Sequence, residues 1–249
     1  MIARAVLTAL VLFALTAPAS AERLIATLST SEVKISSNFT GTGVTVFGAM
    51  EHEAGKRRPK DPSIVVVVRG PPQTVVTREK ERWFGLWINR SARTIPDAPA
   101  FYALHSSRAL ADVAPTDELA KYQIGLSNLV LGPTNEPRDS FENAFLRLKQ
   151  EADLYSEQSG TVDSPGANIF QTTVQIPANV PVGLYTATVY LFDGGKLLAR
   201  ADGSFTINKS GFEQFMFTLA HQRPLFYGVA TAVLALVIGW LAGVIFRRD

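Results

Sequence analysis

The stretch NIFQTTVQIPANVPVGLYTATVYLF, residues 168–192, alternates in side-chain type on both sides of a short proline-containing turn. A period of two is typical of β-strands with one buried face. The second half begins Gly183-Leu184-Tyr185, an entry that resembles the tyrosine corner of immunoglobulin-like sandwiches. The stretch therefore predicts a mainly β protein, an immunoglobulin-like β-sandwich. The side chains predicted to share a strand face are Phe170, Thr172, Val174 and Ile176, and then Tyr185, Ala187, Val189 and Leu191.

Strand patterns also occupy the first part of the chain. Ile64 to Val68 is a continuous β-branched run, which suits a strand buried on both faces. The region from about 92 to 160 differs, because Asp139 followed by Glu142 indicates a helix start with a capping box. We therefore expect a domain at 22–208 in which the sandwich carries a helical insertion at about 92–160.

The end of the chain is apolar enough to cross a membrane. Residues 225–246 contain no charged residue and would form a helix roughly 33 Å long, enough for the ~30 Å hydrocarbon layer. An amphipathic juxtamembrane segment at 209–224 precedes this helix, and a tail with two arginines follows at 247–249. Because basic residues favour the cytoplasmic side, we expect the tail in the cytoplasm and the domain across the membrane.

The first 21 residues have the pattern of a cleaved signal peptide. Arg4 precedes an apolar run, and Ala19-Ser20-Ala21 is a small-x-small sequence of the kind that signal peptidase accepts. We therefore expect the mature chain to begin at Glu22 and its domain to be exported.

The exported domain is electrically neutral. Arg4, Arg247 and Arg248 against Asp249 account for the formal charge of +2, which leaves 21 basic and 21 acidic residues in 22–224. A neutral domain has no electrostatic footprint for nucleic acid, so we expect no nucleic-acid partner.

The sequence shows no constellation of catalytic residues. The chain has no cysteine, which excludes disulfides, thiol nucleophiles and thiolate metal sites. Glu51-His52-Glu53 has the residue types of a metal site, but in a strand His52 points away from both carboxylates. We therefore expect a protein that is not an enzyme and that has no cofactor and no metal.

One candidate site is the stretch RWFGLWINR, residues 82–90. As a single strand it places Trp83 and Trp87 together on one face and the intervening apolar residues on the other. Either the helical insertion covers the two tryptophans, or they form an aromatic patch for a protein partner or an apolar ligand.

A second candidate is a row of small residues within the predicted membrane helix. Small side chains let another helix approach closely, so the row predicts a helix-packing face. Alanine and glycine are also common in membrane helices, so the helix as a simple anchor is the other interpretation. The row consists of Gly228, Ala232, Ala235, Gly239 and Gly243.

Four segments carry a resemblance to a family. They are SNFTGTGVTVFGA (37–49), VVVVRGP (65–71), FENAFLRLKQEADLY (141–155) and VPVGLYTATVYLF (180–192). With them and its two apolar ends, the chain resembles the family of uncharacterised alphaproteobacterial single-pass transmembrane proteins. The resemblance implies a Gram-negative inner membrane with the domain in the periplasm. It also implies a permease similar to the sulfite and organosulfonate exporters as partner, and it assigns no catalytic residues.

Two functions from different classes follow from these patterns. The first is a membrane-anchored periplasmic accessory protein that binds an integral membrane partner, such as a small-anion permease, through the small-residue row. A homodimer is an equally good use of such a row. The alternative is a periplasmic ligand-binding module with a pocket between the sandwich and the helical insertion, near Trp83 and Trp87.

Overall fold

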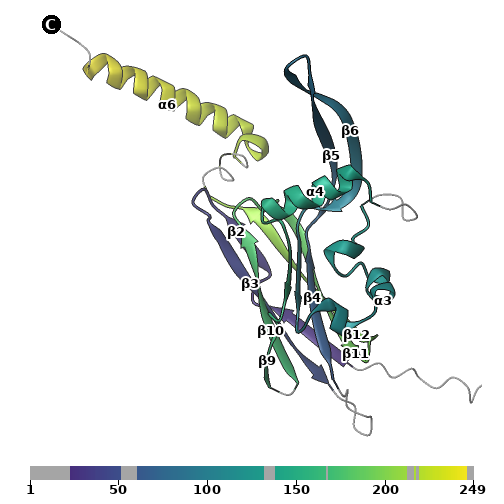
Figure 1. The fold of residues 1–249 in the computed structure, drawn as a ribbon. Coiled ribbons are helices and arrows are strands. Elements are labelled where there is room, and N and C mark those ends of the chain that lie inside the picture. Colours follow the sequence, from purple (N-terminus) through teal and green to yellow (C-terminus); the bar gives the residue numbers. More distant parts are fainter. Residues whose placement is uncertain are drawn as a thin grey trace, which may run out of the picture.

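The chain folds as a mainly β protein, as predicted, with two packed sheets, a separate hairpin and a C-terminal helix (Figure 1). The predicted signal peptide, His52, Glu53 and the predicted tail lie outside the described residues, as does part of the predicted juxtamembrane segment. The computed structural model describes residues 23–51, 61–131, 138–166, 168–211, 216 and 219–245.

The first sheet has four antiparallel strands in the order β1-β3-β10-β9. In β10 every second side chain is buried, because one face of this strand lies on the core and the other faces solvent. The buried side chains are those predicted from the sequence, Phe170, Thr172, Val174 and Ile176. The strand bounds are β1 Arg23–Leu28, β3 Gly41–Glu51, β9 Asp163–Gly166 and β10 Ile169–Pro177.

The second sheet has six strands in the order β2-β12-β11-β4-β7-β8. Its outer pairs, β2 with β12 and β7 with β8, are parallel, and the inner pairs are antiparallel. The immunoglobulin-like detail stays a prediction, because those two pairs depart from an all-antiparallel sandwich. The strand bounds are β2 Glu32–Ile35, β4 Ser63–Arg69, β7 Tyr102–Ser106, β8 Tyr155–Ser159, β11 Gly183–Asp193 and β12 Lys196–Lys209.

The core lies between the sheets and under the helical segments. β4 is buried from Ser63 to Val68, because it is an inner strand with a covered face on each side. The Tyr185 hydroxyl donates a hydrogen bond of 2.5 Å to the carbonyl of Pro181, which is the local geometry of a tyrosine corner. The Tyr185 ring stacks on Phe205 with centroids 5.2 Å apart, so this corner is tied to the centre of the core.

The region predicted as a helical insertion, 92–160, contains strands as well as helices. β7 and β8 belong to the second sheet, and β7 was missed because all its side chains are buried and no alternation marks it. Asp139 caps α4 as predicted, accepting a hydrogen bond from the Glu142 amide at 2.8 Å. The helices are α2 Leu110–Val113, α3 Thr116–Lys121, the 3₁₀ turn η1 Leu126–Asn128, and α4 Ser140–Glu151.

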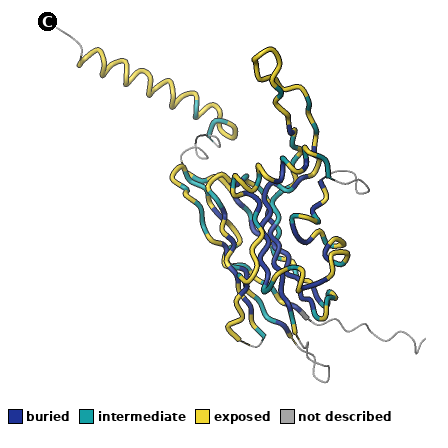
Figure 2. Tube along the Cα trace, viewed as in Figure 1, coloured by how far each residue is buried: buried dark blue, intermediate teal, exposed yellow. Residues whose placement is uncertain are grey.

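Two elements project from the sandwich. The first is the antiparallel hairpin of β5, Pro72–Trp83, and β6, Leu86–Pro99, which we call the arm. The second is α6, Pro224–Ile245. Figure 2 shows that α6 and the outer part of the arm are exposed, whereas buried residues are concentrated in the sandwich, above all in β4, β7 and β11.

Candidate membrane-facing site

The arm and the connection to α6 leave the same end of the second sheet. In the β11–β12 pair, Gly183 lies opposite Ile207, so β11 begins where β12 ends. In the β11–β4 pair, Thr186 lies opposite Arg69, so β4 ends there too. β4 leads directly into the arm, and β12 leads toward α6 (Figure 1). We call this the membrane end of the sandwich.

α6 has the length and composition of a membrane-spanning helix. Its 22 residues give about 33 Å of helix, and it is the one helix in the described part of the chain that is long and apolar enough to cross a bilayer. The predicted span, 225–246, agrees with its bounds to within one residue, and Phe246 lies outside the described residues. The one polar side chain in its middle, Thr231, bonds back to the carbonyls of Tyr227 and Gly228.

The predicted small-residue row forms a continuous face of α6. At about 100° per residue its five members fall within an arc of about 80°. No side chain of α6 is buried against the rest of the chain, and the three glycines have open space where a Cβ would stand. The backbone of this face is therefore accessible to a second helix. The row is Gly228, Ala232, Ala235, Gly239 and Gly243.

The tip of the arm is the five-residue apolar segment Trp83–Trp87. A two-residue loop, Phe84-Gly85, joins the strands, with φ of 45° and 83°. Positive φ at both loop residues is typical of a type I′ turn, for which Asn-Gly is the favoured sequence. A non-glycine residue in this region is disfavoured by roughly 1–2 kcal/mol. The exposed fractions are 58% for Trp83, 87% for Phe84, 70% for Leu86 and 68% for Trp87.

The predicted arrangement of the two tryptophans is wrong in one respect. RWFGLWINR is a strand, a turn and a second strand, so Trp83 lies opposite Leu86 and Trp87 lies opposite Arg82. Residues opposite each other share a face of the ribbon, which places the two tryptophans on opposite faces. Phenylalanine in place of asparagine concealed the turn from sequence reasoning. The insertion helices leave both tryptophans exposed, so the aromatic side chains are accessible.

α4 supports the base of the arm and leaves its outer part free. A groove of about 280 Å³ lies between Thr77–Lys80 of β5 and the α4 face that includes Phe141 and Leu148. Thr77 is the last buried residue of β5 before the tip. Beyond it the exposed basic side chains of Lys80, Arg82 and Arg90 surround the tip, and Arg90 pairs with Glu81 at 3.1 Å.

A family model matches most of this chain. A model described as "Putative transmembrane protein" (Alph_Pro_TM) matches residues 23–248. The chain belongs to this family. The match to the transmembrane protein family spans both sheets, the arm and α6, and the family description agrees with α6 as the membrane anchor. A comparison with curated proteins found no match.

A polar cleft lies at the end of the sandwich opposite the membrane end. The cleft has a volume of about 510 Å³ and lies where β4 begins and β11 ends. Arg108 binds both carboxylate oxygens of Asp61, at 2.5 and 2.6 Å, and this contact lowers the pKa of the Asp61 carboxyl. The Asp61 amide donates to Asp193 at 3.2 Å. The charges of Asp61 and Arg108 in this far cleft therefore bind each other.

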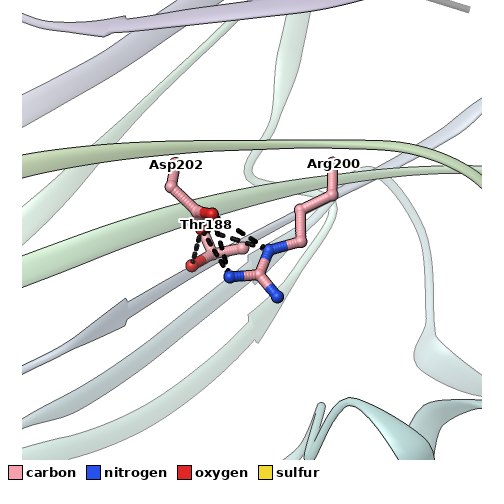
Figure 3. A network of polar contacts seen from close by, with 3 residues as sticks. All are labelled: Thr188, Arg200 and Asp202. Carbon is pink, nitrogen blue, oxygen red and sulfur yellow. Dashed lines mark hydrogen bonds and ion pairs between the residues drawn. The ribbon is translucent and has the colours of Figure 1, made fainter.

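Two further polar groups are accounted for by the fold. Thr188 of β11 donates to Asp202 of β12 at 2.7 Å, and Arg200 binds the same carboxylate at 2.8 Å (Figure 3). Burial alone would raise the pKa of Asp202, but these hydrogen bonds outweigh it and lower the pKa. His105 is buried and lies 2.9 Å from the hydroxyl of Thr172 in the facing sheet. The first group joins β11 to β12, and the second joins β7 to β10.

The described ranges contain no group of three or more His, Cys, Asp or Glu side chains that could hold a metal ion. A cleft of about 580 Å³ does lie between β6 and the segment that joins α3 to α4. Its lining includes Arg93, Gln123, Val130 and Leu131, and the tryptophans of the tip are not part of it.

Proposed function

We propose that this protein is a non-enzymatic accessory protein, anchored in the inner membrane with its sandwich in the periplasm, that binds an integral membrane protein. The observation that supports this is the small-residue face of α6, whose glycines stand open along one side of the helix. Association of helices in lipid depends on close van der Waals packing, which such a face permits.

The proposed partner is a polytopic permease for a small anion, similar to the sulfite and organosulfonate exporters. This choice rests on the resemblance described above. The arrangement of the molecule suits such a partner, because α6 contributes a packing face inside the bilayer while the sandwich stands on one side of it.

A ligand-binding module is the second candidate. The cleft between β6 and the α3–α4 connection has about 580 Å³, within the range of about 300–1,000 Å³ that small-molecule sites occupy. It combines the charged groups of Arg93 and Asp97 with the apolar side chains of Val130 and Leu131. Its ligand would therefore be a small molecule with a polar part and an apolar part.

Purification from native membranes in mild detergent, followed by mass spectrometry, tests the first function. We expect a polytopic protein to co-purify with the wild-type chain and to be lost from a Gly239→Leu, Gly243→Leu variant, because leucine keeps the helices apart. The matched control is Val237→Leu with Val244→Leu, which changes the opposite side of α6. A wild-type chain that emerges alone and monomeric contradicts the accessory function.

The same experiment distinguishes the two candidate functions. Val130→Trp fills the cleft without touching α6. If the partner is retained by Val130→Trp and lost from the glycine variant, the accessory function is supported. A small molecule that co-purifies with the wild type and is lost from Val130→Trp supports the ligand-binding module.

A further inference from the structure

The position and length of the arm bring its tip to the bilayer surface. The arm leaves the membrane end of the sandwich, the same end from which the chain continues to α6. From Thr77, its last buried residue, to Trp83 at the tip, β5 extends about 20 Å. Residues 210–223 connect β12 to α6, and fourteen residues can span about 21 Å as a helix and more when extended. The connection is thus long enough for α6 to enter the membrane at the level of the tip.

The tip is apolar on every side. Trp83 and Leu86 lie on one face of the ribbon, Trp87 lies on the other, and Phe84 is at the apex. A binding patch on the face of a folded domain is one-sided, because its other side is packed on that domain. A projection that is apolar on every side is suited to lipid, which can surround it. Tryptophan is also the residue most typical of the boundary between hydrocarbon and headgroups.

The sequence Phe84-Gly85 is unfavourable for a type I′ turn. Phe84 has φ of 45° and is 87% exposed, so the chain accepts both backbone strain and an exposed ring. Asparagine would suit the same backbone with neither disadvantage. The turn geometry therefore does not account for the phenylalanine ring, and contact with something outside the folded domain would.

The residues behind the tip complement anionic headgroups. Residues 80–90 contain three basic side chains, Lys80, Arg82 and Arg90, and one acidic side chain, Glu81. Basic side chains next to an apolar segment bind anionic lipid surfaces while the apolar part enters the acyl boundary. We propose that Trp83–Trp87 inserts into the outer surface of the membrane that α6 spans, as a second, peripheral anchor. This proposal needs only the anchoring by α6 and is independent of any protein partner.

The test uses the full chain with Trp240→Phe, which leaves Trp83 and Trp87 as its tryptophans. The purified protein is reconstituted alone into nanodiscs of phosphatidylethanolamine and phosphatidylglycerol with brominated acyl chains, and tryptophan fluorescence is recorded. We expect strong quenching by the brominated lipid and weak quenching by aqueous acrylamide. Each apolar side chain withdrawn from lipid weakens insertion by about tenfold.

Phe84→Asn with Leu86→Ser, in the same background, removes apolar area while keeping both reporters and a favourable turn. We expect this variant to lose lipid quenching several-fold and to gain quenching by acrylamide. The control is Val76→Ser, an exposed apolar residue at the base of the same arm, which leaves both readings unchanged. Hydrogen exchange of the β5–β6 amides verifies that the hairpin stays folded in each variant.

Tryptophans that are open to acrylamide and unquenched by lipid in the background protein overturn the proposal. If they are exposed in pure lipid but shielded in native membranes, lipid insertion is also overturned and a protein partner is the occupant of the tip. Loss of the co-purifying permease has no bearing on the result, because no partner is present in these nanodiscs.

Discussion

The protein contains two long antiparallel hairpins with the same kind of turn and opposite surroundings. β11 and β12 are joined by Gly194-Gly195 with φ of 55° and 80°, and β5 and β6 by Phe84-Gly85 with φ of 45° and 83°. Glycine takes this conformation freely, whereas phenylalanine does not. The β11–β12 hairpin is built for stability within the sandwich, and the arm keeps a less stable turn residue for its exposed ring.

The largest difference between the hairpins is expected on truncation of an aromatic ring. Phe205 of β12 is buried against Tyr185, so Phe205→Ala should lower the free energy of unfolding by about 3–5 kcal/mol. Trp87 of the arm is mostly exposed, so Trp87→Ala should change it by no more than about 0.5 kcal/mol. Urea unfolding of the detergent-solubilised full chain measures both. Equal losses would mean that the arm is packed as tightly as the sandwich.

Substitutions at the two turns should change hairpin stability in opposite directions. Gly194→Phe puts a bulky residue at positive φ and should destabilise the β11–β12 hairpin by roughly 1–2 kcal/mol. Phe84→Asn gives the arm the favoured turn sequence and should stabilise it by up to about 1 kcal/mol. Hydrogen exchange of the cross-strand amides next to each turn measures these effects. Gly194→Asn is the control, with a smaller loss than Gly194→Phe. A loss of protection in Phe84→Asn would contradict the strain assigned to Phe84.

Acid should weaken the sandwich and spare the arm. Burial lowers the pKa of His105 below its ordinary value of 6.5, so at pH just under 6.5 the unfolded chain binds a proton that the folded chain does not. The contribution of His105 to the free energy of unfolding should therefore be complete above this pH and should be lost as the pH drops below it. Unfolding at a series of pH values, compared with His105→Gln, measures this contribution. An unchanged pH dependence in His105→Gln would assign the effect to other groups.

The smallest effect should come from the ion pair near the tip. Glu81 and Arg90 are exposed and 3.1 Å apart, so Glu81→Gln should change the stability of the arm by no more than about 0.5 kcal/mol. The same substitution removes the one negative charge among residues 80–90 and so raises the net charge behind the tip by one. We expect it to strengthen lipid quenching of the tip tryptophans in anionic nanodiscs and to leave it unchanged in zwitterionic ones.

The sequence predicted those parts of the fold that are set by local patterns. The alternation in β10, the cap of α4 at Asp139 and the apolar run of α6 all appear where they were expected. β7 was missed because a strand that is buried on both faces has no period of two. The arm was missed because phenylalanine is not among the residues typical of tight turns, which are Gly, Pro, Asn, Asp and Ser.

The candidate site depended on pairings that no local pattern contains. That the arm and α6 share one end follows from the registers of β11 with β12 and with β4, which join residues far apart in the chain. The exposure of Trp83 and Trp87 depends on where α4 packs, at Thr77–Lys80 rather than farther out. The sequence could identify the apolar side chains but not the space around them.

The length of β11 gives the distance between the two ends of the sandwich. Its eleven residues run from the membrane end to the far cleft, about 36 Å of extended chain. Inner strands that are covered on both faces make this distance rigid. The sandwich therefore holds Asp61 and Arg108 at a fixed distance, about the length of β11, from its membrane end.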